Sequence, residues 1–123
     1  MGVKDHRSLI AWKEARALVL QVLDLSRTAW RPWASAVFAQ LQRSSLSVQL
    51  NIAEGYANRG SARYKWHLRV AYGSAVEAGD LLELLGSAGL VRAELAAALI
   101  ARNVTTQKLL WGLIRNLPDH GGG

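Results

Sequence analysis

The chain has 123 residues, half of them apolar, with no cysteine and only two prolines, at Pro32 and Pro118. This length suits one domain with a buried core, and the absence of cysteine excludes disulfides, thiolate metal sites and cysteine nucleophiles. Fifteen Lys and Arg residues against nine acids give a formal charge of +6. Such an excess favours polyanionic partners, although many basic proteins bind none.

A first helix is predicted over residues 9–28, behind a charged N-terminal arm of residues 1–8. Its polar side chains share an arc of about 160°, which leaves about 200° to apolar residues. Packing on one face needs only a little over 100°, so the surplus predicts self-association. Lys13, Glu14 and Arg16 interrupt the apolar run, so it is neither a signal peptide nor a membrane span, and we expect a cytoplasmic protein.

Pro32 breaks the pattern, and Ser35 is predicted to cap a second helix over residues 36–57. Helical spacing predicts that its inner face consists of Val37, Leu41, Ser44, Ser45, Val48 and Ile52. A second apolar patch lies on its far side and comprises Ala39, Leu46, Leu50 and Ala53. An isolated bundle would leave that patch in water, which again favours an oligomer.

A third helix is predicted over residues 61–85, capped by Ser61. Its inward face consists of Tyr64, Leu68, Ala71, Ala75, Ala78, Leu82 and Leu85. Gly73 and Gly79 each weaken a helix by about 1 kcal/mol, and glycine in mid-helix usually indicates close packing.

Gly89 is predicted to end the third helix in a left-handed conformation, with Leu90 folding back onto it. A fourth helix is predicted over residues 92–117, with Leu99 and Leu110 on its main apolar face and Val104 and Trp111 beside them. Residues 118–123 form the predicted tail. Four helices with short joints predict a single all-α domain of residues 9–117, an up-down-up-down antiparallel four-helix bundle.

Several short matches then indicate a family. They are Leu9, Trp12-Lys13, Gln42-Arg43, the string Asn51-Ile52-Ala53-Glu54-Gly55, Arg59, Ser61, Ala71, Gly73-Ser74, Glu77, Leu113-Ile114 and Leu117. With these residues the chain resembles the four-helix-bundle proteins encoded in intervening sequences of bacterial 23S rRNA genes. It departs from them at Gln49-Leu50, where they tend to have Pro and Ser, and at Arg63, where they tend to have an acid.

The resemblance implies a small cytoplasmic bundle that assembles as a ring of five subunits and has no established enzymatic activity. The family is similar in fold to the accessory proteins of diversity-generating retroelements, which assist a reverse transcriptase and bind nucleic acid. Expected partners are therefore other copies of the chain, RNA or DNA, and a reverse transcriptase if the chain is of the accessory type.

Asn51 and Glu54 are the most distinctive polar residues, and they allow two interpretations. Glu54 would be a general base or metal ligand, or both side chains would bond a neighbouring helix or the following loop and fix its register. The second is favoured because no His or further carboxylate stands at ligand spacing in the sequence. With Gly55, Gly73 and Glu77 they form a predicted structural motif, and we expect no catalytic residue, metal site or cofactor.

The histidines are scattered at positions 6, 67 and 120, and their spacing assembles neither a triad nor a zinc site. Trp12, Trp66 and Trp111 follow the helical spacing of other apolar residues. They are interpreted as core or interface anchors in preference to base-stacking platforms.

The third predicted helix begins with a basic run of Arg59, Arg63, Lys65 and Arg69, and no acid occurs between Glu54 and Glu77. The run is interpreted either as a phosphate-binding patch or as an ordinary solvated face. The sequence thus predicts a non-enzymatic, nucleic-acid-associated scaffold. The alternatives are a protein-interaction module whose charge is incidental and an enzyme whose site the sequence does not reveal.

Overall fold

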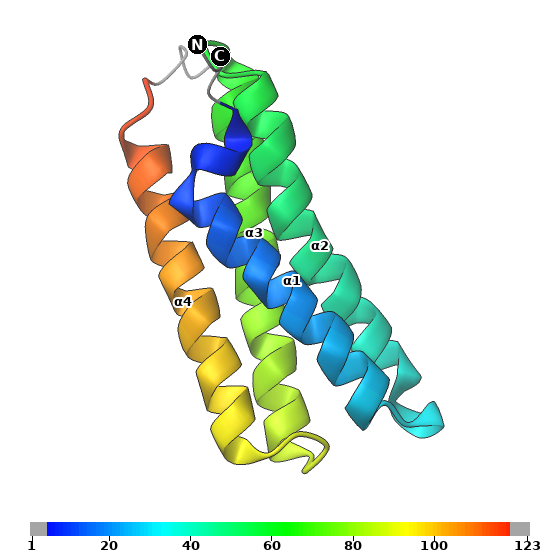
Figure 1. Cartoon of the computed structure of the whole chain (residues 1–123). Coiled ribbons are helices and arrows are strands. Elements are labelled where there is room, and N and C mark those ends of the chain that lie inside the picture. The colour runs from blue at the N-terminus through cyan, green and yellow to red at the C-terminus, as the bar shows by residue number, and fades with distance from the viewer. Residues whose placement is uncertain (1–4, 119–123) are drawn as a thin grey trace.

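A computed structural model describes residues 5–118 and contains four long helices, α1 (Ile10–Ala29), α2 (Ser35–Ala57), α3 (Ala62–Ser87) and α4 (Ala93–Arg115). Short 3-10 turns at His6–Ser8 and Pro32–Ala34 precede α1 and α2. Each helix packs closely on its two neighbours around the bundle, and within residues 5–118 the backbones of neither diagonal pair approach one another closely (Figure 1). The predicted all-α four-helix bundle is confirmed. Residues 1–4 of the predicted arm and 119–123 of the predicted tail lie outside the described part.

The core follows the helical periodicity of the sequence. All seven residues of the predicted inward face of α3 are buried, from Tyr64 to Leu85. They meet Leu18 and Val22 of α1, Leu41 and Ile52 of α2 and Leu99 and Leu110 of α4, which are also buried. The sequence predicts this face because apolar residues that repeat every 3.6 positions form one stripe along the helix. That stripe leaves water only when it faces the other helices.

Two predicted helix ends are confirmed. The Ser61 hydroxyl accepts a hydrogen bond from the backbone N–H of Arg63 at 3.3 Å, as an N-cap does. Gly89 has a φ of 74°, and the N–H of Leu90 bonds back to the carbonyl of Leu85 at 3.0 Å. This left-handed turn is the reason that glycine suits position 89.

The predicted cap at Ser35 is wrong. Ser35 already has helical angles, φ −56° and ψ −35°, and α2 begins with this residue. Pro32 starts a 3-10 turn, whose last bond runs from the N–H of Ser35 to the carbonyl of Pro32. That turn leads directly into the helix, so no side-chain cap is used.

Close approach between helices depends on two glycines. A Cβ atom on Gly55 would lie 2.9 Å from Cβ of His67, and one on Gly79 would lie 2.9 Å from Nδ2 of Asn103. Nothing lies within 4 Å of the corresponding position on Gly73. Close packing is therefore confirmed for Gly79 and wrong for Gly73, which faces outward.

Two of the three tryptophans interpreted as core or interface anchors are not core residues. Trp66 of α3 is 61% exposed and Trp111 of α4 is 53% exposed. The inner face of α4 contains Asn103 and Thr106 instead, and the Asn103 amide donates to the carbonyl of Ala75 at 2.7 Å. Asn103 can be buried because its amide has a hydrogen-bond partner on α3. Hydropathy alone would place an apolar residue at that position.

The outer surface of α1 and α2 is apolar in places. Leu46 and Leu50 of α2 are exposed, as are Leu20 and Leu23 of α1. This is the exposed apolar patch that the spacing of α2 predicts for an isolated bundle.

Gly55→Ala should lower the free energy of unfolding by about 1–3 kcal/mol, because the new methyl group meets the Cβ atom of His67. Gly73→Ala is the matched control. It should raise that free energy by about 0.5–1 kcal/mol, because the added methyl group meets nothing and alanine is the better helix former. Urea unfolding measures both, and equal stability of the two variants would contradict the close approach of α2 to α3.

Candidate nucleic-acid interface

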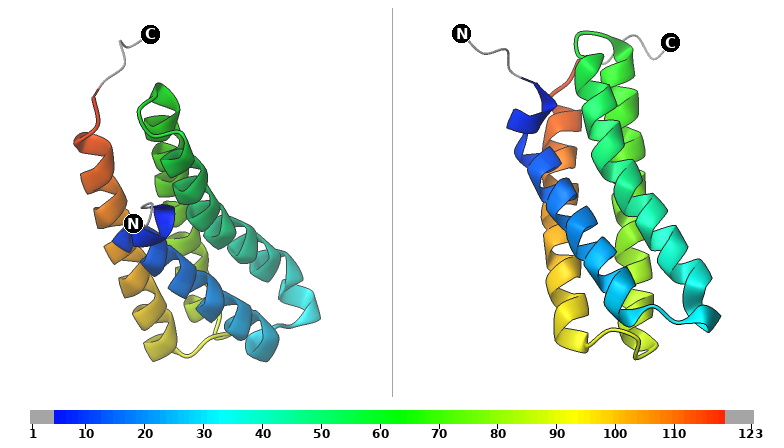
Figure 2. Two further views of the ribbon diagram at one scale, coloured as in Figure 1. Left: turned by 45° about the horizontal axis from the view of Figure 1, so that its top comes forward. Right: turned by 45° about the vertical axis from the view of Figure 1, so that its right-hand side comes forward.

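Polar side chains join α2 to α3 along the outer edge of their contact. The hydroxyl oxygens of Ser47 and Ser74 are 2.7 Å apart, and Gln40 donates to the carboxylate of Glu77 at 3.2 Å. The Arg43 guanidinium in turn donates to the side-chain amide oxygen Oε1 of Gln40 at 3.0 Å. We call this row, together with the cluster described next, the polar seam. It fixes the register of two antiparallel helices that run side by side (Figure 2).

The seam continues to Asn51, His67 and Glu54. The Asn51 amide donates to the carbonyl of Ser47 at 2.9 Å, so its oxygen faces Nδ1 of His67, also at 2.9 Å. Since that oxygen can only accept, a hydrogen bond between the two atoms requires the proton of the His67 ring to be on Nδ1. The Glu54 carboxylate lies 3.8 Å from the same nitrogen.

The structure thus brings His67 onto the Asn51 string, which sequence spacing did not reveal. The available signal was positional, because His67 lies one turn from both Tyr64 and Ala71 of the inward face. Among residues 5–118 no three His, Cys, Asp or Glu side chains gather where they could hold a metal ion. What the structure shows in the seam is a row of side-chain hydrogen bonds between α2 and α3.

The structure divides the predicted basic run. Arg59 and Lys65 line one hollow of about 330 Å³ beside Tyr64 and Leu117. The Arg59 guanidinium lies 4.0 Å from the centre of the Tyr56 ring. Burial raises the pKa of Tyr64, an effect that the nearby Tyr56 adds to and Arg59 opposes. The hollow is thus a partly apolar recess with two cations at its edge.

Arg69 follows Lys65 by one turn of α3 and is exposed. Arg63 is also exposed but leaves the helix about 160° away from Lys65, on the side that faces α2. Arg63 is therefore not part of one patch with Lys65 and Arg69. Residues that are two positions apart on a helix point to nearly opposite sides. Their closeness in the sequence therefore does not place them in one patch.

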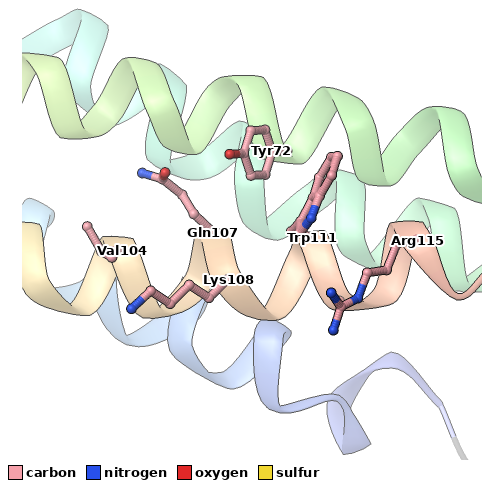
Figure 3. A pocket seen from close by; sticks show the side chains of 7 residues that line it. Tyr72, Val104, Gln107, Lys108, Trp111 and Arg115 are labelled. Carbon is pink, nitrogen blue, oxygen red and sulfur yellow. The ribbon is translucent and has the colours of Figure 1, made fainter.

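Two further cations, missed in the sequence, lie on α4. Lys108 and Arg115 line a hollow of about 400 Å³ together with Tyr72 and Trp111 (Figure 3). Because α3 and α4 are antiparallel, the turn before Tyr72 that holds Arg69 lies at the same end of the bundle as Arg115. We call Arg59, Lys65, Arg69, Lys108 and Arg115 the basic end.

Charged residues are unevenly distributed along the α3–α4 pair. No Asp or Glu occurs in residues 55–76 or 104–118, the two stretches that contain the basic end. Residues 77–94 at the other end hold four acids, Glu77, Asp80, Glu83 and Glu94, and only one cation, Arg92. Three of these acids, Glu77, Asp80 and Glu83, line a third hollow of about 610 Å³ between α3 and α4. The positive charge of the α3–α4 pair is therefore concentrated at one end.

These features define a small all-α bundle with a locked α2–α3 pair and a charged α3–α4 face. The sequence profile of the 23S rRNA-intervening sequence protein family matches residues 7–112, and the chain belongs to that family. No curated protein matches the sequence significantly.

A crystal structure of a protein of unknown function from the S23 ribosomal protein family of Bacteroides thetaiotaomicron VPI-5482 has the same fold. The TM-score is 0.81 at 20% identity, over 87% of this chain and 96% of that one. This similarity supports the bundle architecture. Within residues 5–118, no helix combines the length and the hydropathy that a membrane crossing requires.

Asn51→Ala should lower the free energy of unfolding by about 1–3 kcal/mol, because it leaves the buried His67 ring without its acceptor. Gln49→Ala, two residues earlier on α2, is the control and should have little effect. Nitrogen-15 NMR of the neutral ring should show the Nδ1-protonated tautomer in the wild type. A proton on Nε2 would show that Asn51 does not orient His67.

Proposed function

We propose that this protein is a non-enzymatic cytoplasmic homo-oligomer that associates with RNA or DNA through the basic end of the α3–α4 pair. One observation carries the proposal, namely that the five cations of the basic end, which come from two helices and a loop, all belong to two stretches of the chain, residues 55–76 and 104–118, that contain no Asp or Glu. Like charges placed together repel one another and lower stability, so the protein itself gains nothing from this arrangement. A phosphate backbone would offset the repulsion and release its counterions.

The position of two cations near the N-terminus of α3 also supports binding of a polyanion. Arg63 and Lys65 stand in its first turns, where the helix dipole disfavours positive charge by a few tenths of a kcal/mol. Helix stability therefore does not explain them. Contacts of this kind give affinity and orientation on a strand without reading its sequence.

Self-association is the second part of the proposal. The apolar outer surface of α1 and α2 lies opposite the α3–α4 face, because α1 is diagonal to α3 and α2 is diagonal to α4 in the described bundle. A ring that used the α1–α2 surface would leave the basic ends accessible, and resemblance to the family leads us to expect five subunits. A reverse transcriptase partner stays a prediction for a chain of the accessory type. A protein-interaction module without nucleic-acid binding is the alternative.

Arg69→Glu/Arg115→Glu should weaken binding of a 30-nucleotide RNA about tenfold or more at 50 mM salt and lower the log–log salt slope by about 2. Arg31→Glu/Arg92→Glu, with the same charge change away from the basic end, is the matched control and should bind nearly as the wild type does. Fluorescence anisotropy over a salt series measures both. Absence of binding at low salt, or binding that salt does not weaken, would favour the interaction-module alternative.

Light scattering of the wild type should give a molar mass of about five times the 13.4 kDa of one chain. Leu46→Glu/Leu50→Glu places charge on the apolar surface of α2 and should yield folded monomers. Leu84→Glu, at an exposed leucine on α3, should leave the mass unchanged. A wild type that is monomeric at micromolar concentration would refute the proposed assembly.

A further inference from the structure

The indole of Trp111 is held at the surface of the basic end. Its ring centre lies 5.9 Å from that of Tyr72, with the two planes inclined by 50°. Figure 3 shows the indole projecting from α4 toward α3, beside the hollow that Tyr72, Gln107 and Lys108 also line. Nothing lies within 4 Å of the position where Gly112 would carry a Cβ, so the neighbouring surface of α4 is open as well. Tyr72 thus positions the indole while about half of Trp111 stays accessible.

Cations stand on both sides of this indole. Lys108 precedes Trp111 by three residues and Arg115 follows it by four, so each is about one helical turn away. Both are exposed, and neither forms an ion pair within residues 5–118. In Figure 3 the Lys108 side chain extends along α4 toward Val104, and the Arg115 side chain extends back toward Trp111.

This arrangement distinguishes a stacking platform from an apolar anchor. A protein partner that covered Trp111 would have to desolvate Lys108 and Arg115, and uncompensated buried charges cost several kcal/mol each. A nucleic-acid strand places a flat base and negative phosphates within a few ångströms of one another, which matches an indole between two cations. The hollow of about 400 Å³ also falls within the range of about 300–1,000 Å³ typical of small-molecule sites.

We propose that Trp111 is a base-stacking platform that makes the basic end selective for single-stranded nucleic acid. A base stacks on the exposed indole, and Lys108 and Arg115 contact the phosphates on either side of it. In a duplex the faces of the bases are covered by their neighbours, so only an unpaired base can stack in this way. This inference rests on the proposed binding of nucleic acid and adds strand selectivity to it.

The test compares binding of labelled dT12, U12, a 12-base-pair DNA duplex and an abasic deoxyribose-phosphate strand of 12 units. Stacking is worth about 1–3 kcal/mol per base, so Trp111→Leu should weaken dT12 and U12 binding by about 5- to 150-fold. The same variant should change duplex and abasic-strand binding less than twofold, since those ligands use phosphate contacts alone. Trp111→Phe should restore most of the lost affinity, because an aromatic face is retained.

Trp33→Leu is the control, because Trp33 is also exposed but lies in the turn before α2. It should leave all four affinities unchanged. Equal losses for dT12 and the duplex in Trp111→Leu, or no loss for either, would overturn stacking while leaving the proposed function intact. A changed oligomer mass would also overturn it, by showing Trp111 to be a subunit contact. Failure of every ligand to bind the wild type would refute the proposed function itself.

Discussion

The close approach of α2 to α3 at Gly55 is the contact on which the rest of this structure depends. Position 55 has no side chain, so the backbone of α2 can lie against Cβ of His67. That approach brings Asn51 and His67 within 2.9 Å and the hydroxyls of Ser47 and Ser74 within 2.7 Å. The row of polar bonds then sets the register of the two helices, and the register sets where the basic residues of α3 project.

The two outer sides of the bundle differ in their charge pattern. The outer side of α1 and α2 exposes leucines, and the α3–α4 pair exposes cations at one end and acids at the other, together with apolar side chains such as Trp66 and Leu84. The two surfaces face opposite directions, so an assembly through one leaves the other free. This separation makes a scaffold that both self-associates and binds a polyanion physically reasonable. Membership of the family supplies the fold, and the proposed role rests on the charge distribution.

Predictions from the sequence succeeded where a single helix decides the outcome. The stripe from Tyr64 to Leu85, the cap at Ser61 and the left-handed turn at Gly89 each depend on a few consecutive turns of chain. They failed where a neighbouring element decides. Ser35 does not cap α2, because the 3-10 turn that begins at Pro32 leads directly into the helix. Gly73, which was expected to lie at a close helix contact, faces open space. Trp111 lies at the helical spacing of apolar residues and is nevertheless exposed, whereas Asn103 and Thr106 of the same helix are buried in the bundle.

The sequence by itself determined four amphipathic helices, their short joints and an excess of positive charge, because periodicity and composition are local properties. The tertiary structure alone decided which side chains meet. Arg69 and Arg115 come to one end through the antiparallel packing of α3 on α4, and the same packing places Trp111 beside Tyr72. His67 reaches Asn51 because a glycine lets two helices approach. Such contacts depend on how helices cross, which is set by packing across the whole bundle and is not encoded in any one segment.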